Sequence, residues 1–278
     1  MLVACGGGVT TDLVGFAAAT ILRGVRWAAV PTTLLGMIDA AIGGKTGINH
    51  AKAKNVIGAI WQPEFVYINT QFLHTLCQRQ FDTGLGELVK YAGLIGEPMI
   101  SRLNEWFSEE TSSSPRLMED LVAACVAYKA EIVGQDEREV GVRTYLNLGH
   151  TFGHGIEQAA GYGKLLHGEA VILGLLAALI LGEKTGIGSQ PRLAAYRKLV
   201  ERTVSLVPYR RIDASRALSA MNLDKKRRNG SSRFVLLERP GKPILSAGIP
   251  PQVVRDAMLD AMKYYRKTGG RRAKNPDR

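Results

Sequence analysis

Three of the chain's five histidines, His150, His154 and His167, lie close together in the sequence. Because residues four positions apart project from one face of a helix, His150 and His154 can point into a single pocket. Neutral imidazoles and a carboxylate, for which Glu87 is the candidate, are ligands that a zinc-like ion takes while one position stays open for substrate. The spacing fits equally well a helix whose histidines are only hydrogen-bonded, so other residues must decide between the two interpretations.

A glycine-rich turn stands near the N-terminus. Gly6, Gly7 and Gly8 follow a short apolar strand and open a helix. Glycines in this position let backbone N–H groups approach a phosphate, and the helix N-terminus favours its negative charge. The same residues are equally typical of a plain strand-to-helix turn, because they do not match the dinucleotide-binding fingerprint.

A second glycine-rich loop, residues 39–49, carries Lys45 and is followed by Lys54 and Asn55. It matches a P-loop only in part, because Asp39 stands where that motif requires its first glycine. Ammonium and amide donors on a backbone of small residues still suit a phosphate group. The alternative interpretation is an exposed basic loop.

Further charged residues flank these motifs. Glu87 and Lys90 lie three positions apart, which as an exposed ion pair on a helix is worth only about 0.5 kcal/mol but beside a metal makes Glu87 a ligand. Three more polar residues precede the histidines: Lys129, Arg143 and Asn147. The basic run at residues 224–228 is typical of a solvated face, although it could also close over an anion.

The composition indicates a protein with a substantial core. Of the 278 residues, 46% are hydrophobic, which suffices for one large domain or two ordinary ones. The longest apolar run, residues 170–182, is too short to span a bilayer, and the first residues lack the basic segment of a signal peptide. The three cysteines are far apart and have no metal-ligand spacing. We therefore expect a cytoplasmic protein with reduced thiols and no membrane partner.

Much of the net charge of +11 lies at the C-terminus. From Lys263 onward there are seven basic residues and one acidic residue, so this segment carries +6. Residues 267–278 are polar and interrupted by glycine and proline, which is typical of a disordered tail. Because the tail lacks interleaved aromatic residues, we expect no nucleic-acid partner, and the remaining positive charge suits an anionic small substrate.

The N-terminal residues alternate between strands and helices. Residues 2–5, 27–31 and 65–68 are expected to be short apolar strands, with a helix over residues 11–22. Such alternation predicts a parallel sheet covered by helices. The expected fold class is therefore α/β plus all-α: a partial Rossmann-like parallel sheet domain followed by a larger helical metal-binding domain.

From about residue 81 onward the pattern is helical, with one strand pair expected near residues 233–237. The expected helices cover residues 85–95, 116–135, 149–160, 168–186, 191–206 and 251–266. The predicted domains are an α/β domain over residues 1–76, a helical domain over residues 77–266 and a basic tail over residues 267–278. We expect the functional site between the first two domains.

Together these motifs resemble 3-dehydroquinate synthase, and they occur in that family's order over residues 6–226. The matching motifs are Gly6–Asp12, Leu22-Arg23-Gly24, Pro31-Thr32-Thr33-Leu34-Leu35, Asp39 with Gly43-Gly44-Lys45-Thr46-Gly47-Ile48-Asn49, Lys54-Asn55, Glu87-Leu88-Val89-Lys90-Tyr91, Asn147-Leu148-Gly149-His150-Thr151-Phe152-Gly153-His154, His167-Gly168-Glu169 and Asp224-Lys225-Lys226.

The resemblance implies a phosphate lyase of the shikimate pathway, which serves chorismate and aromatic amino acid biosynthesis. The substrate would be 3-deoxy-D-arabino-heptulosonate 7-phosphate, an anionic sugar acid phosphate. Transient oxidation of one hydroxyl, phosphate elimination, reduction and aldol cyclisation would give 3-dehydroquinate. The resemblance also implies NAD, recycled in each turnover, a divalent metal (Zn²⁺ or Co²⁺) and a homodimer.

The resemblance assigns roles by position. The metal ligands would be Glu87, His150 and His167, whereas His154, which the spacing nominated, would lie beside the substrate phosphate. The catalytic residues would be Asp39, Lys45, Lys90, Asn147 and His154. The NAD site would be lined by Gly6, Gly7, Gly8, Asp12, Thr32, Thr33, Lys54 and Thr75. Asn55, Lys225 and Lys226 would bind the phosphate, Lys129 and Arg143 the carboxylate, and Arg23 would reach into a neighbouring subunit.

One departure concerns the N-terminus. Members of the family carry roughly a hundred residues before the glycine turn, about one domain's worth. This chain begins at the strand before that turn, so we expect an unpaired sheet edge, an exposed apolar face and weakened NAD affinity.

Alternatives from two classes remain. The first is another sugar phosphate cyclase or a glycerol-dehydrogenase-like oxidoreductase, although Lys129 and Arg143 favour a substrate that carries a carboxylate. The second is a catalytically incomplete fragment, which metal binding without turnover would indicate.

Overall fold

The computed structural model describes residues 1–50, 53–108, 114–161, 163–227 and 233–270. The chain forms two compact units: unit 1 comprises Met1–Leu88 and Ser113–Arg143, and unit 2 comprises Val89–Ser112 and Thr144–Arg278. The boundary falls within one helix, α2 (Gln78–Ile95). The predicted boundary at residues 76 and 77 stays a prediction.

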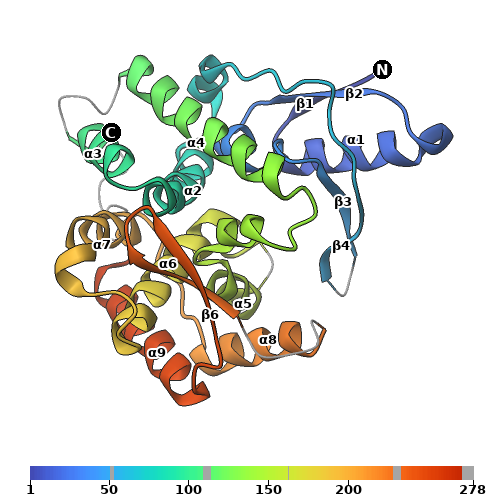
Figure 1. Ribbon diagram of the computed structural model, residues 1–278. Coiled ribbons are helices and arrows are strands. Elements are labelled where there is room, and N and C mark those ends of the chain that lie inside the picture. Colours follow the sequence, from blue (N-terminus) through green and yellow to red (C-terminus); the bar gives the residue numbers. More distant parts are fainter. Residues whose placement is uncertain (51–52, 109–113, 162, 228–232, 271–278) are drawn as a thin grey trace. The chain divides into compact units, whose positions relative to one another are not determined.

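Unit 1 is built on a short parallel sheet. Strand β1 (Leu2–Gly6) pairs with β2 (Trp27–Pro31), and α1 (Gly8–Thr20) connects them (Figure 1). Strand β2 is the buried centre, because the side chains of its first three residues are at most 2% exposed. The third predicted strand is reduced to one parallel bridge between Ala29 and Val66. The parallel βαβ arrangement is therefore confirmed.

A β-hairpin follows where the sequence predicted a glycine loop. Strands β3 (Lys45–His50) and β4 (Ala53–Ile60) pair antiparallel, so the loop prediction is wrong for residues 45–49. The physical reason lies in Gly47 and Gly58, which face each other in the ladder. A Cβ on Gly58 would lie 2.3 Å from the carbonyl oxygen of Thr46. The two glycines therefore let the backbones of β3 and β4 approach closely, and they do not mark a flexible loop.

The remaining elements of unit 1 are short turns and one long helix. The turns are η1 (Ile21–Arg23), the π-helical η2 (Gly36–Ala40) and η3 (Thr70–Thr75). Helix α4 (Pro115–Gln135) packs against η2. It begins one residue before the predicted start, and the Ser114 hydroxyl caps it by accepting a hydrogen bond from the backbone N–H of Leu117 at 3.3 Å.

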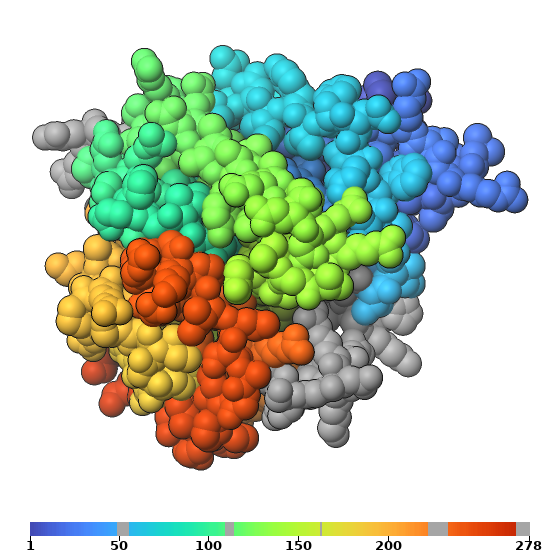
Figure 2. Space-filling model, viewed as in Figure 1, coloured from blue at the N-terminus to red at the C-terminus, as the bar shows by residue number. Residues whose placement is uncertain are grey.

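Unit 2 is mainly helical, as predicted. Its elements are the second half of α2, α3 (Glu97–Trp106), α5 (His150–Ala160), α6 (His167–Lys184), α7 (Gln190–Val204), α8 (Ala214–Arg227), α9 (Pro251–Thr268) and the hairpin of β5 (Arg233–Arg239) and β6 (Lys242–Ala247). The hairpin confirms the expected strand pair, and the half-exposed β6 lies on the face shown in Figure 2. Helices α3 and α8 were not predicted.

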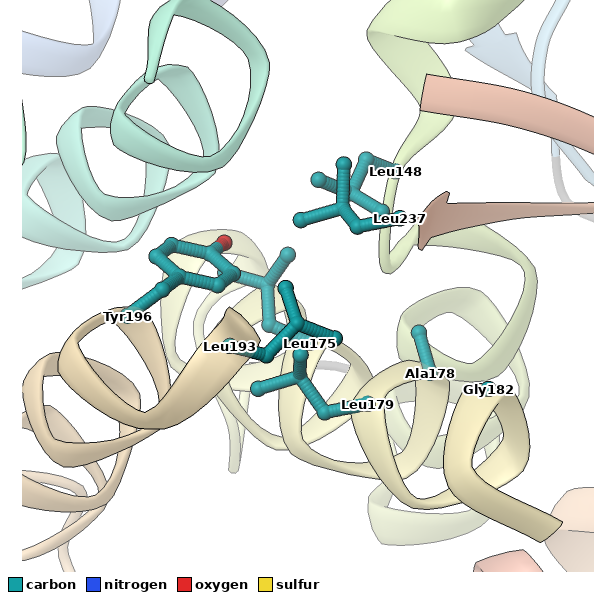
Figure 3. Close-up of a pocket in the computed structure, with 8 residues that line it drawn as sticks. All are labelled: Leu148, Leu175, Ala178, Leu179, Gly182, Leu193, Tyr196 and Leu237. Carbon is teal, nitrogen blue, oxygen red and sulfur yellow. The ribbon is translucent and has the colours of Figure 1, made fainter. Parts of the chain in front are cut away.

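Helix α6 is the core of unit 2. Every residue from Gly168 to Gly182 is buried, as expected for a helix that is apolar on all sides. Helices α5, α7 and α9 and strand β5 pack around it. Figure 3 shows one apolar contact of this core, where Leu175 and Leu179 of α6 face Tyr196 of α7 and Leu237 of β5. Among the described residues, no helix is long and apolar enough to cross a membrane.

Three glycines let α5 approach α6 closely. Gly149 precedes α5 in a left-handed conformation (φ +78°), which a side chain would strain. A Cβ on Gly174 of α6 would lie 2.1 Å from the carbonyl oxygen of Gly149 and 2.7 Å from the backbone nitrogen of Gly153. Because these obstacles are backbone atoms, only a shift of one helix could relieve the clash.

This contact predicts that Gly174→Ala destabilises the protein by at least about 2 kcal/mol, despite alanine's better helix propensity. Urea unfolding followed by circular dichroism measures the change. Gly134→Ala in α4 is the matched control, because no atom lies within 4 Å of its added Cβ and that site is exposed. The control should be unchanged or more stable by up to about 1 kcal/mol. Equal behaviour of the two variants would show that the helices can separate at little cost.

Candidate active site

The three histidines form a cluster at the adjacent ends of two helices. His150 is the first residue of α5, and His167 is the first residue of α6. The ring centroids of these two are 5.3 Å apart, and the ring of His154 lies 5.5 Å from His150 and 5.9 Å from His167. The close approach of α5 to α6 therefore brings together imidazoles that are 17 positions apart at most.

Glu87 completes a set of possible metal ligands. One ligand atom from each of Glu87, His150 and His167 lies within 4.8 Å of the others. Glu87 is fully buried and stands in α2, two positions before Val89, where unit 2 begins. His154 is not a member of this set, although its helical spacing from His150 nominated it. These are the residues that the family resemblance assigned, and their role as ligands stays a proposal.

The surroundings of the two histidines suit metal binding. Nδ1 of His150 lies 3.2 Å from the carbonyl oxygen of Leu148, and a hydrogen bond there requires the proton on Nδ1. That tautomer leaves the lone pair of Nε2 available to a metal. Nδ1 of His167 lies 3.8 Å from a carboxylate oxygen of Glu157, which is buried. A carboxylate behind a histidine is a common orienting partner in metal sites.

Two other predicted residues lie one helical turn from the ligands in sequence. Lys90 follows Glu87 by three positions, is 1% exposed, and has its ammonium 4.7 Å from the centroid of the Tyr91 ring. Asn147 ends the short helix η4 (Val142–Asn147), three positions before His150. Burial of a lysine ammonium is costly in the absence of polar or aromatic neighbours, and the Tyr91 ring is one such neighbour of Lys90.

In unit 1, the glycine turn has the geometry of an anion-binding helix start. Gly7 is the N-cap of α1 and contributes no side chain to cap it. A Cβ on Gly8 would lie 2.9 Å from Cβ of Ala40, so the turn is packed closely against η2. Thr32 donates its backbone N–H to the carbonyl oxygen of Gly6 at 2.9 Å, and the Thr33 hydroxyl accepts from Gly36 at 3.1 Å.

A buried charge cluster adjoins this turn. The ammonium of Lys129, which is 6% exposed, lies 2.7 Å from a carboxylate oxygen of Asp39. Burial, with a smaller contribution from the charge of Asp39, raises the pKa of Asp12 to about 7, while Lys129 opposes the rise. Asp12 is thus partly protonated near neutral pH, and the structure brings together these three predicted residues.

Arg143 is held by a loop that the sequence interpretation missed. The buried carboxylate of Asp136 accepts backbone hydrogen bonds from Val140, Gly141 and Arg143 at 2.7–3.0 Å. Burial alone would raise the pKa of Asp136, but these N–H groups lower it below its ordinary value. The Arg143 guanidinium donates to the carbonyl oxygen of Gly43 at 2.8 Å and to that of Glu137. The sequence does contain a sign of this loop: Asp136 directly follows a predicted helix and precedes Gly141 by five residues.

Glu139, on the same loop, forms an ion pair with Lys45. The sequence interpretation also missed Glu139, because the two residues are 94 positions apart. The Lys45 side chain is 51% exposed, and with Asp12 it lines a hollow of about 340 Å³ beside strands β3 and β4. A cation at the edge of an open hollow can exchange a carboxylate partner for an incoming anion.

The remaining predicted residues are not brought to these clusters by any described contact. The Thr75 hydroxyl donates to the carbonyl oxygen of Phe72 within its own turn, η3. Arg23 is exposed and has a left-handed backbone (φ +64°). Four predictions fall on residues whose side chains lie outside the described part of the chain: Lys54 and Asn55 in β4, and Lys225 and Lys226 in α8.

Comparison of the sequence with known protein families identifies the family of the chain. A family model described as 3-dehydroquinate synthase N-terminal matches residues 1–83, and one described as 3-dehydroquinate synthase C-terminal matches residues 84–227. The chain belongs to the 3-dehydroquinate synthase family. It is 42% identical to the 3-dehydroquinate synthase of Legionella pneumophila strain Philadelphia 1 over 270 residues, which are 96% of this chain and 72% of that protein. The resemblance of the sequence motifs is confirmed.

Solved structures agree with this family assignment. ValA, a 2-epi-5-epi-valiolone synthase from Streptomyces hygroscopicus subsp. jinggangensis 5008 with NAD⁺ and Zn²⁺ bound, has a TM-score of 0.85 at 27% identity over 94% of this chain and 73% of that one. A 2-deoxy-scyllo-inosose synthase complexed with carbaglucose-6-phosphate, NAD⁺ and Co²⁺ has a TM-score of 0.81 at 26% identity over 93% and 72%. The predicted fold class is confirmed.

The ligand set predicts different effects of two histidine substitutions. His167→Ala should weaken zinc binding by more than the about 10–100-fold typical of a lost outer-shell partner, because it removes a ligand. His154→Ala should retain one zinc with an affinity within about tenfold of the parent chain. Competition with a chromophoric chelator measures both affinities. Loss of zinc from the His154 variant alone would contradict the assignment of ligands in this 3-dehydroquinate synthase family member.

The raised pKa of Asp12 predicts a pH-dependent stability. The folded chain binds a proton at Asp12 that the unfolded chain releases near its ordinary pKa of 3.8. Stability from this proton is therefore fully present below pH 4 and is lost as the pH rises through about 7. Asp12→Asn should be increasingly more stable than the parent chain as the pH rises from 5 to 8. Urea unfolding at several pH values measures this difference, and a difference independent of pH would contradict the assignment.

Proposed function

We propose that the chain is a 3-dehydroquinate synthase, which converts 3-deoxy-D-arabino-heptulosonate 7-phosphate to 3-dehydroquinate and phosphate. The observation that carries the proposal is the group of Glu87, His150 and His167 in a chain whose family models cover residues 1–227. The curated relative at 42% identity bears the same name. The reaction is an elimination of phosphate, so the enzyme is a carbon–oxygen lyase of the shikimate pathway.

Glu87, His150 and His167 would hold a divalent metal, Zn²⁺ or Co²⁺. One carboxylate and two imidazoles fit such an ion and leave coordination positions for substrate oxygens. A hydrogen bond from Nδ1 of His150 to the carbonyl oxygen of Leu148 would leave the lone pair of Nε2 for the ion. When bound, the metal would supply Lewis-acid chemistry at a substrate hydroxyl, and NAD would supply reversible hydride transfer.

NAD would bind at the glycine turn of unit 1. Gly6, Gly7 and Gly8 bring backbone N–H groups and the N-terminus of α1 to its pyrophosphate. Thr32 and Thr33 flank this turn, because Thr32 donates its backbone N–H to Gly6 and a Cβ on Gly7 would lie 3.1 Å from Cγ2 of Thr33. Because Asp12 has a pKa of about 7, a protonated carboxyl can donate a hydrogen bond to the cofactor. Lys54 and Thr75 complete the proposed set.

The substrate carries two anionic ends, and the chain has cations for each. Lys129 and Arg143 would bind the carboxylate, because both are buried cations that can make charge-assisted hydrogen bonds. Burial, opposed by neighbouring carboxylates, lowers the pKa of Arg143, yet a guanidinium stays charged at neutral pH. Lys45 would bind the phosphate after releasing Glu139, together with Asn55, Lys225 and Lys226.

The remaining residues would orient the substrate and move protons. Asp39, fixed by Lys129 at 2.7 Å, would accept a hydrogen bond from a substrate hydroxyl. Lys90 and Asn147 would donate to hydroxyl oxygens. His154 lies next to the ligand histidines without belonging to the ligand set, so its ring nitrogen can exchange a proton beside the leaving phosphate.

A carboxylate-bearing substrate distinguishes this function from its nearest alternative. Carbaglucose-6-phosphate, the molecule in the related inosose synthase complex, has a phosphate but no carboxylate. An enzyme for such substrates has less use for a buried lysine and a buried arginine that can both make charge-assisted hydrogen bonds to a carboxylate. Lys129 and Arg143 therefore favour the sugar acid phosphate.

We also propose a homodimer in the cytoplasm that binds no nucleic acid. The support for the dimer is the turn at Leu22 and Arg23, two successive residues with left-handed backbones (φ +50° and +64°). Each costs roughly 1–2 kcal/mol, and such strain is retained where the conformation serves a purpose. Leu22 is 86% exposed, so the turn projects Arg23 outward, where it would reach the site of a neighbouring subunit.

Phosphate release from 3-deoxy-D-arabino-heptulosonate 7-phosphate, with zinc and excess NAD⁺, tests the proposed activity directly. Release that a chelator abolishes and zinc restores is the expected result. Absence of release from folded, zinc-loaded protein would contradict the proposal for this chain.

Substitution of the carboxylate-binding lysine tests the choice of substrate. Lys129→Gln should raise KM for the sugar acid phosphate at least about tenfold. The matched control is Lys198→Gln, which changes an exposed lysine of α7 and should leave KM unchanged. An unchanged KM in the Lys129 variant would favour a cyclase whose substrate lacks a carboxylate.

A further inference from the structure

An arginine-lined groove lies on unit 2, away from the histidine cluster. Its walls are the segment that leads into α8, residues 209–216, and one face of α9. Four arginines line it: Arg210, Arg211, Arg216 and Arg266. We call this feature the arginine groove. Its volume is about 550 Å³, within the range of small-molecule sites.

The four guanidinium groups have no carboxylate partner among the described residues. Of the described residues that line the groove, Asp213 is the only acidic one. One oxygen of its carboxylate accepts backbone hydrogen bonds from Ser215 at 2.8 Å and Arg216 at 3.2 Å, so it caps the start of α8. The described lining thus carries a net charge of +3, and its arginines are available to an anion.

The floor of the groove is fixed and partly aromatic. The hydroxyl of Tyr265, a residue 1% exposed, donates to the carbonyl oxygen of Pro208 at 2.5 Å and accepts from the backbone N–H of Arg210 at 2.8 Å. Burial raises the pKa of Tyr265 to about 12, so this phenol adds no negative charge. The ring of Tyr209 lies 5.7 Å from that of Tyr265 and is 46% exposed, which leaves aromatic surface for a ligand.

The groove is distinct from the candidate metal site. Ala159, which lines it, is nine residues beyond His150 on the same helix, α5, and a rise of 1.5 Å per residue separates them by about 14 Å. A second hollow of about 450 Å³ shares Ala159 and Arg216 with the groove and is also lined by Lys164. Positive charge therefore continues along the surface beside α5 and α8.

We propose that the arginine groove binds a flat organic anion that carries at least two carboxylates. Planar guanidinium groups pair with carboxylates in a bidentate manner, which explains the preference for arginine. The exposed Tyr209 ring and the side chain of Leu259, 44% exposed, provide an apolar surface that suits the flat face of a ring. An inorganic anion would leave this apolar surface unused.

Isothermal titration of the zinc-loaded chain with benzene-1,3,5-tricarboxylate tests the proposal. Its carboxylates are too far apart to chelate zinc through one ring edge, and titration of the groove variant measures any binding of the anion elsewhere on the chain. Arg211→Ala with Arg266→Ala should weaken binding at least about tenfold. The matched control, Arg102→Ala with Lys198→Ala, removes the same charge from exposed positions of α3 and α7 and should weaken binding less than about twofold.

A second comparison tests the preference for a flat ligand. Tyr209→Leu should weaken binding of the benzene tricarboxylate more than binding of the non-planar propane-1,2,3-tricarboxylate. The substituted residues, Arg211, Arg266, Arg102, Lys198 and Tyr209, are all exposed. Circular dichroism checks that each variant is folded. The proposal is overturned if the parent chain does not bind, if the control weakens binding as much as the groove variant, or if both tricarboxylates respond equally to the Tyr209 change.

Discussion

The candidate site depends on the closeness of two helices. His150 and His154 lie on α5, and His167 lies at the start of α6, so the distance between their rings is set by how closely these helices pack. A Cβ on Gly149 or Gly174 would collide with a backbone nitrogen or a carbonyl oxygen, and a Cβ on Gly153 would lie in tight contact with the carbonyl oxygen of Ala170 at 3.2 Å. The buried stretch Gly168–Gly182 of α6 supports this arrangement, because α5, α7, α9 and β5 all pack against the helix. A metal site needs ligands placed within a few tenths of an ångström, and rigid helices provide such placement.

In unit 1 the main constraint is the burial of charged side chains. Lys129 and Arg143 are almost fully buried, and each is compensated by the chain itself. Asp39 pairs with Lys129, and carbonyl oxygens of Gly43 and Glu137 accept from Arg143. The cluster disfavours the charged form of Asp12, because burial and the neighbouring charge of Asp39 raise the pKa of Asp12 to about 7. Clusters of this kind are typical of sites that bind charged ligands.

Much of the fold could be predicted from the sequence, because the relevant patterns are local. Apolar periodicity predicted five helices to within about two residues at each end, and it missed the first seven residues of α2. The hairpin of β3 and β4 could not be predicted in this way, because its glycines serve a contact between strands rather than a loop. Helices α3 and α8 were also missed. In α8, the basic run that begins at residue 224 is typical of a solvated face and gave no sign of a helix.

The site was predictable only in part. Spacing on one helix favoured His154 as a ligand, whereas the group of possible ligand atoms contains His167 from another helix and Glu87 from a third. Glu139 was not predicted, because its partner Lys45 is distant in sequence. Glu157 was not predicted, because its partner His167 lies on another helix. Such pairings depend on tertiary packing, which no single sequence pattern specifies.

X-ray absorption spectroscopy of the zinc-loaded chain tests the ligand set of Glu87, His150 and His167. This ligand set gives a first shell of oxygen and nitrogen atoms at about 2.0–2.2 Å, with outer-shell scattering from two imidazoles. Scattering from three imidazoles would place His154 on the metal and would show that this ligand set is wrong.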